Sequence, residues 1–276
     1  MMTSQIPTLH YTSFVIKFEL GHVARAIRTP QAGDVERIVS ALGLKTSSVI
    51  FIIGGAAFME DTSSSQIRDV IAHGLARFAQ ERRVTIIDGG TATGVMEVIG
   101  QARRQFNYSF PLIGVAPFNK ISFPGHSGGE RATPLEKNHS HFVLTEGDHF
   151  GDESDMITRL VRAISQNQRN HALGLIVNGG IIARHEAYVH TIESKPFKLL
   201  VFDGSGRLAD DVAEAKKTGL VPRAKGMDLR ELIEMTTITK SNDVNVFRIS
   251  EGPNALYSRL QHELRGVTKQ LFWSRD

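Results

Sequence analysis

The chain of 276 residues contains no cysteine. This absence excludes disulfide bonds, zinc–thiolate centres and cysteine nucleophiles. The chain also has no apolar run of the roughly 20 residues that a membrane-spanning helix requires, since the longest such run covers only residues 49–59. The N-terminal stretch has neither the charged region nor the apolar core of a signal peptide. We therefore expect a cytoplasmic protein that does not insert into a membrane.

Concentrations of one charge are also missing. Lys and Arg total 32 and Asp and Glu total 29, which gives a formal net charge of +3, and these residues are spread along the chain. Without a block of five or six like charges, no nucleic-acid partner is expected. The composition, 41% hydrophobic and 22% charged, is typical of a globular protein with a substantial core.

Expected strands and helices alternate along most of the chain. Apolar runs rich in β-branched residues occur at residues 49–53, 84–88, 111–116, 173–177 and 197–202, as in strands covered on both faces. Apolar residues at helical spacing follow most of these runs. The alternation predicts an α/β fold, a Rossmann-like doubly wound sheet that is mostly parallel. Because no Pro-, Gly- or Ser-rich linker divides the chain, we expect a single domain over residues 1–276, with its core at about 47–218.

Elaborations are expected at both ends of this core. Residues 11–18 alternate loosely, as an edge strand would, and residues 34–42 have the spacing of a short helix. Residues 141–145 predict a short strand, residues 244–249 a further strand and residues 253–263 a helix. Ser65 is a candidate N-cap for the helix that follows the first core strand.

Four expected strands end in closely spaced glycines: Gly54-Gly55, Gly89-Gly90, Gly179-Gly180, and Gly204 with Gly206. In an open parallel sheet, ligands bind at the carboxyl ends of the strands. Glycine lets backbone N–H groups approach an anion closely, and the next helix N-terminus supplies further donors. Strand-to-helix turns also favour glycine for structural reasons, but four such turns together predict a phosphate-binding rim. Neither the G-x-G-x-x-G fingerprint nor a Walker A motif is present.

Several polar residues accompany these turns, and each has two readings. Thr91 and Thr93 either cap a helix or donate to phosphate oxygens, and Arg207 is either a phosphate partner or a surface arginine. His139 and His141 would share one face of a strand, as half of a metal site, as a general base or as part of a polar loop that reaches the ligand. Because no third ligand stands at a suitable spacing, no metal is expected.

The predicted ligand-binding residues include residues of each glycine turn and their polar neighbours. They are Gly54, Gly55, Ala56, Gly89, Gly90, Thr91, Thr93, Gly94, Val95, Pro117, Asn138, His139, Asn178, Gly179, Gly180, Gly204, Ser205, Gly206 and Arg207.

Seven segments carry a resemblance to a known family. They are IGGA at 53–56, DGGTATGVM at 88–96, PLIGVAP at 111–117, LEKNHSHF at 135–142, GDES at 151–154, VNGG at 177–180 and GSGRLAD at 204–210. Together they resemble the SLOG superfamily of Rossmann-like domains and, more closely, the prokaryotic LSDAT family. That family is related to the N-terminal cytosolic region of melastatin-type TRP channels. The resemblance implies a sensor of a nucleotide-derived ligand such as ADP-ribose, an NAD derivative or a cyclic nucleotide, with no other cofactor required. Its output would run through self-association or an effector partner.

A more distant resemblance is to the lonely-guy phosphoribohydrolases, whose signature is P-G-G-x-G-T-x-x-E. Gly179, Gly180 and Glu186 keep that spacing, but Asn178 replaces the proline and Ile182-Ala183 replaces the Gly-Thr pair. The alternative function is therefore hydrolysis of a nucleotide N-glycosidic bond with Glu186 as the catalytic carboxylate. Glu186 is otherwise a solvent-facing residue. A third hypothesis is a structural module whose sheet serves only oligomerisation.

Overall fold

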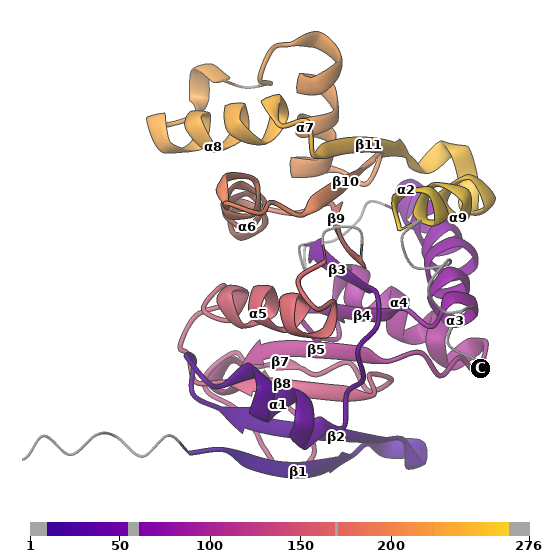
Figure 1. The fold of residues 1–276 in the computed structure, drawn as a ribbon, viewed down its shortest axis with the longest axis vertical. Helices are drawn as coiled ribbons and strands as arrows, with labels where there is room; N and C mark the ends of the chain where they lie inside the picture. Colours follow the sequence, from indigo (N-terminus) through magenta and orange to yellow (C-terminus); the bar gives the residue numbers. More distant parts are fainter. Residues whose placement is uncertain (1–9, 55–60, 169–170, 223, 265–276) are drawn as a thin grey trace, which may run out of the picture.

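The computed structural model describes residues 10–54, 61–168, 171–222 and 224–264. In this part of the chain, a nine-stranded sheet has the order β1-β2-β8-β5-β4-β3-β9-β10-β11 (Figure 1). Only β1 and β2 pair antiparallel; the other neighbours in this sheet are parallel. The α/β class and the Rossmann-like, mostly parallel sheet expected from the sequence are confirmed.

The strands of the large sheet are β1 (Thr12–Lys17), β2 (Val23–Thr29), β3 (Val49–Gly54), β4 (Thr85–Asp88), β5 (Leu112–Pro117), β8 (His141–Thr145), β9 (Ala172–Val177), β10 (Lys198–Asp203) and β11 (Val244–Arg248). The short strands β6 (Ile121–Ser122) and β7 (Thr133–Pro134) pair separately. The α-helices are α1 (Val35–Leu42), α2 (Asp61–Asp69), α3 (Arg77–Arg82), α4 (Gly94–Gln105), α5 (Ser154–Ile164), α6 (Ile181–Ile192), α7 (Arg207–Thr218), α8 (Leu229–Lys240) and α9 (Gly252–Glu263). A π-helical segment, η2 (Val70–Ala76), joins α2 to α3.

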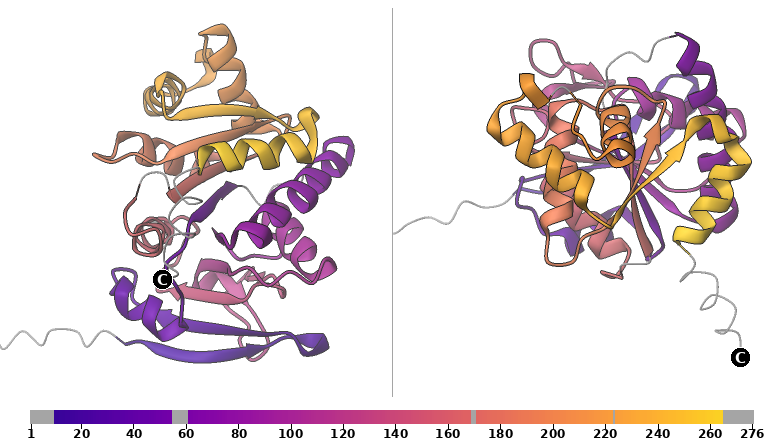
Figure 2. Two further views of the ribbon diagram at one scale, coloured as in Figure 1. Left: turned by 45° about the vertical axis from the view of Figure 1, so that its right-hand side comes forward. Right: turned by 90° about the horizontal axis from the view of Figure 1, so that it is seen from above.

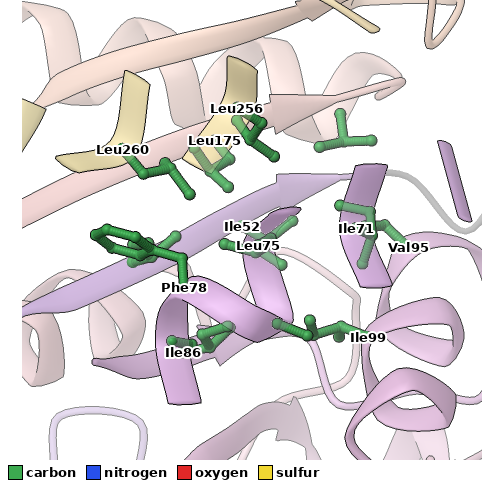
Figure 3. Close-up of a cluster of buried hydrophobic side chains, with 14 of the residues drawn as sticks. Ile52, Ile71, Leu75, Phe78, Ile86, Val95, Ile99, Leu175, Leu256 and Leu260 are labelled. Atoms are coloured by element: carbon green, nitrogen blue, oxygen red, sulfur yellow. The ribbon is translucent and has the colours of Figure 1, made fainter. Parts of the chain in front are cut away.

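Helices cover both faces of the sheet (Figure 2). The apolar run of β3 explains why, because its side chains alternate between the two layers. Ile50 and Ile52 pack with η2, α4 and α9, whose apolar side chains meet the sheet in Figure 3. Phe51 and Ile53 pack on the opposite face with α1, α5, α6, α7 and α8. A strand buried on both faces has no polar positions to alternate with, so it reads as a continuous hydrophobic run.

The strand order reverses between β3 and β9. From β3 the chain continues through β4, β5 and β8 in one direction, and β9, β10 and β11 extend the sheet in the other. Gly54 at the end of β3 lies opposite Val177 at the end of β9. Such a topological switch point is where open α/β sheets bind their ligands.

Three elements differ from the sequence-based expectations. Strand β2 was not expected, because its buried residues include the weakly apolar Ala24 and Ala26. Helix α8 was also missed, although Asp228 and Glu231 form a capping box at its start. Ser65 lies inside α2, which begins at Asp61, so the predicted N-cap is wrong. Every helix of the described residues is too short or too polar to cross a membrane.

Candidate functional site

The predicted glycine turns lie along one edge of the sheet. They follow β4, β3, β9 and β10, which are adjacent and mutually parallel. The prediction that these turns share one rim is therefore confirmed for Gly54 and for the turns after β4, β9 and β10. Gly55 and Ala56 lie outside the described residues.

At Gly54 the neighbouring segments leave no room for a side chain. A Cβ placed there would lie 2.8 Å from Val95 Cγ1 and 3.3 Å from the Val177 carbonyl oxygen. Glycine is therefore required at this position because α4 and the end of β9 both converge on the end of β3. Val95 itself is buried in the core, so its side chain supports the turn from within.

The turn between β4 and α4 is tightly held. Gly90 has φ +66°, and its N–H donates to Asp88 Oδ1 at 2.7 Å. The hydroxyls of Thr91 and Thr93 are 2.9 Å apart and hydrogen-bond to each other. Thr93 occupies the N-cap position of α4, yet its side chain makes no capping hydrogen bond within the described chain.

Gly89 and Gly94 complete this turn. A Cβ at Gly89 would meet no described atom within 4 Å, so space is open beside it. Gly94 starts α4 with φ +55°, a conformation that glycine adopts without steric cost. Pro117 lies buried at the carboxyl end of β5, two strands from β3.

Beneath this turn, His139 joins two carboxylates in the interior. Its Nδ1 lies 2.8 Å from Glu136 Oε2 and its Nε2 lies 2.9 Å from Asp88 Oδ1, and the side chain is 0% exposed. Burial alone would lower the pKa of His139, but Asp88 and Glu136 outweigh it and raise that pKa to about 9. The side chain of Asn138 is also buried and donates to Glu136 Oε1 at 2.6 Å. Asn138 and His139 therefore hold the turn from below and do not reach the rim.

His141 lies apart from this cluster. Its Nδ1 bonds to the Ser140 hydroxyl at 2.8 Å, whereas the two ring nitrogens of His139 contact carboxylates. Among the described residues, no group of three His, Asp or Glu side chains is placed to hold a metal ion.

The turn between β10 and α7 already binds a carboxylate side chain of the protein itself. The N–H groups of Gly204 and Gly206 both donate to Asp210 Oδ1, at 2.8 and 3.0 Å. Ser205 Oγ accepts from the Asn178 N–H at 2.8 Å and donates to the Phe202 carbonyl at 2.6 Å. The expectation that these amides are bare is therefore wrong, because Asp210 occupies the place foreseen for a phosphate.

Asn178 connects the turns that follow β9 and β10. It adopts φ +57° and is 3% exposed. Its carbonyl accepts from the Ala209 N–H at 3.1 Å. The side-chain oxygen is buried and has no hydrogen-bond partner among the described residues, which is uncommon for a native polar group.

Gly179, Gly180 and Arg207 lie together in a pocket of about 370 Å³ between α6, α7 and α8. Arg207 has φ +48°, and a Cβ on Gly180 would lie 2.7 Å from its Nη2. The guanidinium thus rests on the first turn of α6, and no described residue hydrogen-bonds or ion-pairs with it. The other lining residues are Ile181, Arg184, Leu208, Asp211, Gly226, Met227, Glu231 and Met235.

An ion-pair network fixes α8 against α6 beside this pocket. Arg184 donates to Glu231 Oε1 at 2.8 Å and to Glu234 Oε2 at 2.9 Å. Glu234 is 3% exposed, and its carboxylate also contacts His185 Nδ1 and Arg230 Nε. The sequence analysis missed this network, for which the only local signal is the capping box of α8.

Glu186 lies outside the lining of this pocket, at the contact of α5 and α6. It is half-buried and accepts a hydrogen bond from the Ser154 hydroxyl. Burial raises the pKa of Glu186. The neighbouring Glu153 accepts from the Gly151 N–H at 2.7 Å, and burial, with the Glu186 charge adding to it, raises the pKa of Glu153 to about 7.

Comparisons with known proteins agree with this architecture. A family profile described as "SLOG in TRPM, prokaryote" matches residues 47–257. Similar proteins include transient receptor potential cation channel subfamily M member 2 from Mus musculus, 27% identical over 220 residues, which are 67% of this chain and 14% of that protein. Subfamily M member 7 from Rattus norvegicus is 28% identical over 89% of this chain and 15% of its own length. The chain thus spans about one seventh of the curated relatives it matches.

Proposed function

The chain belongs to the prokaryotic family of SLOG domains related to TRPM channels, and from this premise we propose that it is a sensor domain for a phosphate-bearing, nucleotide-derived ligand. The ligand class is ADP-ribose, an NAD derivative or a cyclic nucleotide. It binds along the rim from Gly54 and the first turn of α4 to Gly179, Gly180 and Arg207.

One observation carries this proposal, namely the convergence at Gly54. There Val177 at the end of β9 and Val95 in the first turn of α4 leave no room for a Cβ at the end of β3, at the switch point. Glycine in a strand often marks a place where a ligand or another backbone segment approaches closely. Helix N-termini at such a place favour anions.

The contents of the neighbouring turns support an anionic ligand. Asp88 and Asp210 place carboxylates on the amides after β4 and β10, which are the positions a phosphate would take. The first turn of α6, all of it described, carries no acidic residue and has the guanidinium of Arg207 beside it. This turn can therefore still bind an external anion, whereas in the turn after β10 the carboxylate of Asp210 already occupies the N–H groups.

Calorimetric titration of the purified chain with ADP-ribose, NAD, AMP and cyclic AMP tests the proposal. We expect saturable binding of at least one of them and much weaker binding of adenosine, which has no phosphate. A ligand at 100 times its Kd raises the free energy of unfolding by about 2.7 kcal/mol, which a thermal-shift measurement detects. The proposal fails if none of the four phosphate compounds binds.

Gly54→Ala is the matching variant. The added Cβ clashes with Val95 and displaces α4, at a cost of about 1–3 kcal/mol of stability. Ile16→Val in the distant β1 costs about 0.5–1.5 kcal/mol and serves as the control. We expect Gly54→Ala to weaken ligand binding and Ile16→Val to leave it unchanged.

The cluster of Glu186, Ser154 and Glu153 favours a second candidate, N-glycosidic hydrolysis. A carboxyl group with a pKa of about 7 beside a second carboxylate has the properties of an acid–base pair. Glu186 would stabilise positive charge on the ribose or activate water. Release of free base from AMP, NAD or ADP-ribose, abolished by Glu186→Gln, supports the enzyme. Binding without release supports the sensor.

Output through self-association or an effector is part of the sensor proposal. Sedimentation velocity with and without bound ligand tests the first route. A ligand-dependent change in mass supports self-association, and an unchanged mass points to a separate effector.

A further inference from the structure

The pocket between α6, α7 and α8 combines three kinds of surface. The Arg207 guanidinium, which has no partner in the described part of the chain, and the Gly180 backbone form one side. Leu208, Met227 and Met235 supply an apolar surface. Glu231 adds a carboxylate on the α8 side and Asp211 a second one on the α7 side. A ligand complementary to all three has an anionic end, a flat apolar body and hydrogen-bond donors.

The size of the pocket limits that ligand. A volume of about 370 Å³ lies near the lower end of the range for small-molecule sites. It suits one nucleoside phosphate and not a whole dinucleotide. A larger ligand has to leave the pocket at Gly179 and Gly180, which continue directly to the switch point at the end of β9.

The walls of the pocket are preformed. Arg184 ties α6 to Glu231 and Glu234 of α8, and Lys216 of α7 donates to the carbonyls of Thr239 and Ser241 at the end of α8. These contacts fix the three helices without using Arg207. A preformed site loses less conformational entropy on binding than one that must be assembled.

We propose that this pocket binds the nucleoside 5′-phosphate part of the ligand, an inference that rests on the proposed function. The phosphate lies on Arg207 and the first turn of α6. The base packs on Met227 and Met235, since thioethers make favourable contacts with aromatic rings. Glu231 accepts from a ribose hydroxyl or an exocyclic amine. In a longer ligand the second half extends over the rim towards Gly54.

Three probes separate the contributions of phosphate and base: AMP, ribose 5-phosphate and adenosine. We expect the wild-type chain to bind AMP at least about tenfold more tightly than ribose 5-phosphate, which corresponds to about 1.4 kcal/mol from the base. Adenosine is expected to bind weakly because it leaves Arg207 without a partner. Equal affinities for AMP and ribose 5-phosphate overturn the inference.

Two variants locate these contributions. Met227→Gln keeps the length of the side chain and removes its apolar character, so AMP affinity should fall about tenfold and ribose 5-phosphate affinity should not change. The matched control is Leu229→Gln, two residues further along the chain at the start of α8, where the side chain is 74% exposed and outside the pocket. Arg207→Gly removes the cation and suits φ +48° better than arginine does, so the fold is retained. It should weaken AMP and ribose 5-phosphate alike.

The outcomes distinguish this inference from the proposed function. If AMP or ADP-ribose binds, but Met227→Gln and Arg207→Gly leave its affinity unchanged while Gly54→Ala weakens it, the ligand occupies the rim and the pocket assignment is wrong. If no phosphate compound binds the wild-type chain, both the proposed function and this inference fail.

Discussion

Replacing His139 by glutamine should destabilise the protein in a pH-dependent way. The imidazole lies between Asp88 and Glu136 with no solvent exposure, and these carboxylates raise the pKa of His139 from 6.5 to about 9. At 1.36 kcal/mol per pKa unit, that difference corresponds to about 3 kcal/mol of stability. Removing one partner of a buried ion pair costs about 3–5 kcal/mol, which agrees in magnitude.

The sign of the pH dependence follows from the raised pKa. Below pH 6.5 the histidine is protonated in both folded and unfolded chains, and the full stabilisation is present. Between pH 6.5 and 9 the folded chain retains a proton that the unfolded chain has lost, so stability decreases as the pH rises. Above pH 9 the stabilisation is gone. His139→Gln should therefore cost about 3 kcal/mol at pH 6.5 and much less at pH 10.

Urea unfolding followed by circular dichroism at several pH values between 6.5 and 10 measures this difference. His262→Gln is the control, since His262 is exposed on α9 and its replacement should change little. A difference between wild type and His139→Gln that is the same at pH 6.5 and pH 10 would refute the assignment of His139 as a buried cation. The same result would also contradict the role of the charged His139 side chain in supporting the turn before α4.

Three further predictions concern other buried groups. Burial, with Arg162 adding to it, lowers the pKa of His190 to about 4, so wild-type stability should decrease as the pH falls from 6.5 towards 4. His190→Phe, in contact with Phe51, should flatten that part of the urea-measured pH profile, and an unchanged profile would contradict this. Asp210→Asn should cost about 1–2 kcal/mol, because a neutral acceptor replaces a charge-assisted one at the start of α7; calorimetric melting measures the loss, and no change would argue against the contact. Glu234→Ala should cost about 1.5–3 kcal/mol, because Arg184 loses the more buried of its two carboxylate partners and keeps Glu231; the double variant with Arg184→Ala should cost less than the two single changes added together, and strict additivity would contradict the coupling.

The sequence predicted the layers of the fold because the core strands carry their own signal. Residues 49–53 and 173–177 are apolar throughout, and glycines come soon after each run, so their burial on both faces and the edge of the sheet at which they end were predicted. Strand β2 gave no such signal, because alanine and arginine alternate in it. It forms because β1 and β8 supply hydrogen-bonding partners on both sides, and no property of its own sequence indicates them.

The position of the rim was predictable from the sequence. Whether its backbone N–H donors are free or already hydrogen-bonded was not. Gly204 and Gly206 have the spacing of an anion site, but the anion is Asp210 in the next turn of the chain. His139 was expected at the ligand and lies instead under the turn, since its partner Asp88 is distant in sequence. Arg207 lies beside Gly180, a contact that the sequence did not indicate, and the opposite wall of the pocket comes from α8, which had not been expected at all. Local patterns identify candidate donors, and only tertiary contacts decide which of them remain unpaired.

The pairing of β3 with β9 has a consequence for how the molecule is made. During synthesis the first half of the sheet, from β1 to β8, leaves the ribosome before β9 has been made. Until then β3 is an edge strand with no neighbour on one side. Contacts between such distant segments form slowly, and an unpaired edge strand invites association with other chains. The rim that we assign to the ligand is thus among the last parts to form. Nucleotides present during refolding should raise the yield of native protein, because they bind and stabilise the pair of strands once β9 has joined β3.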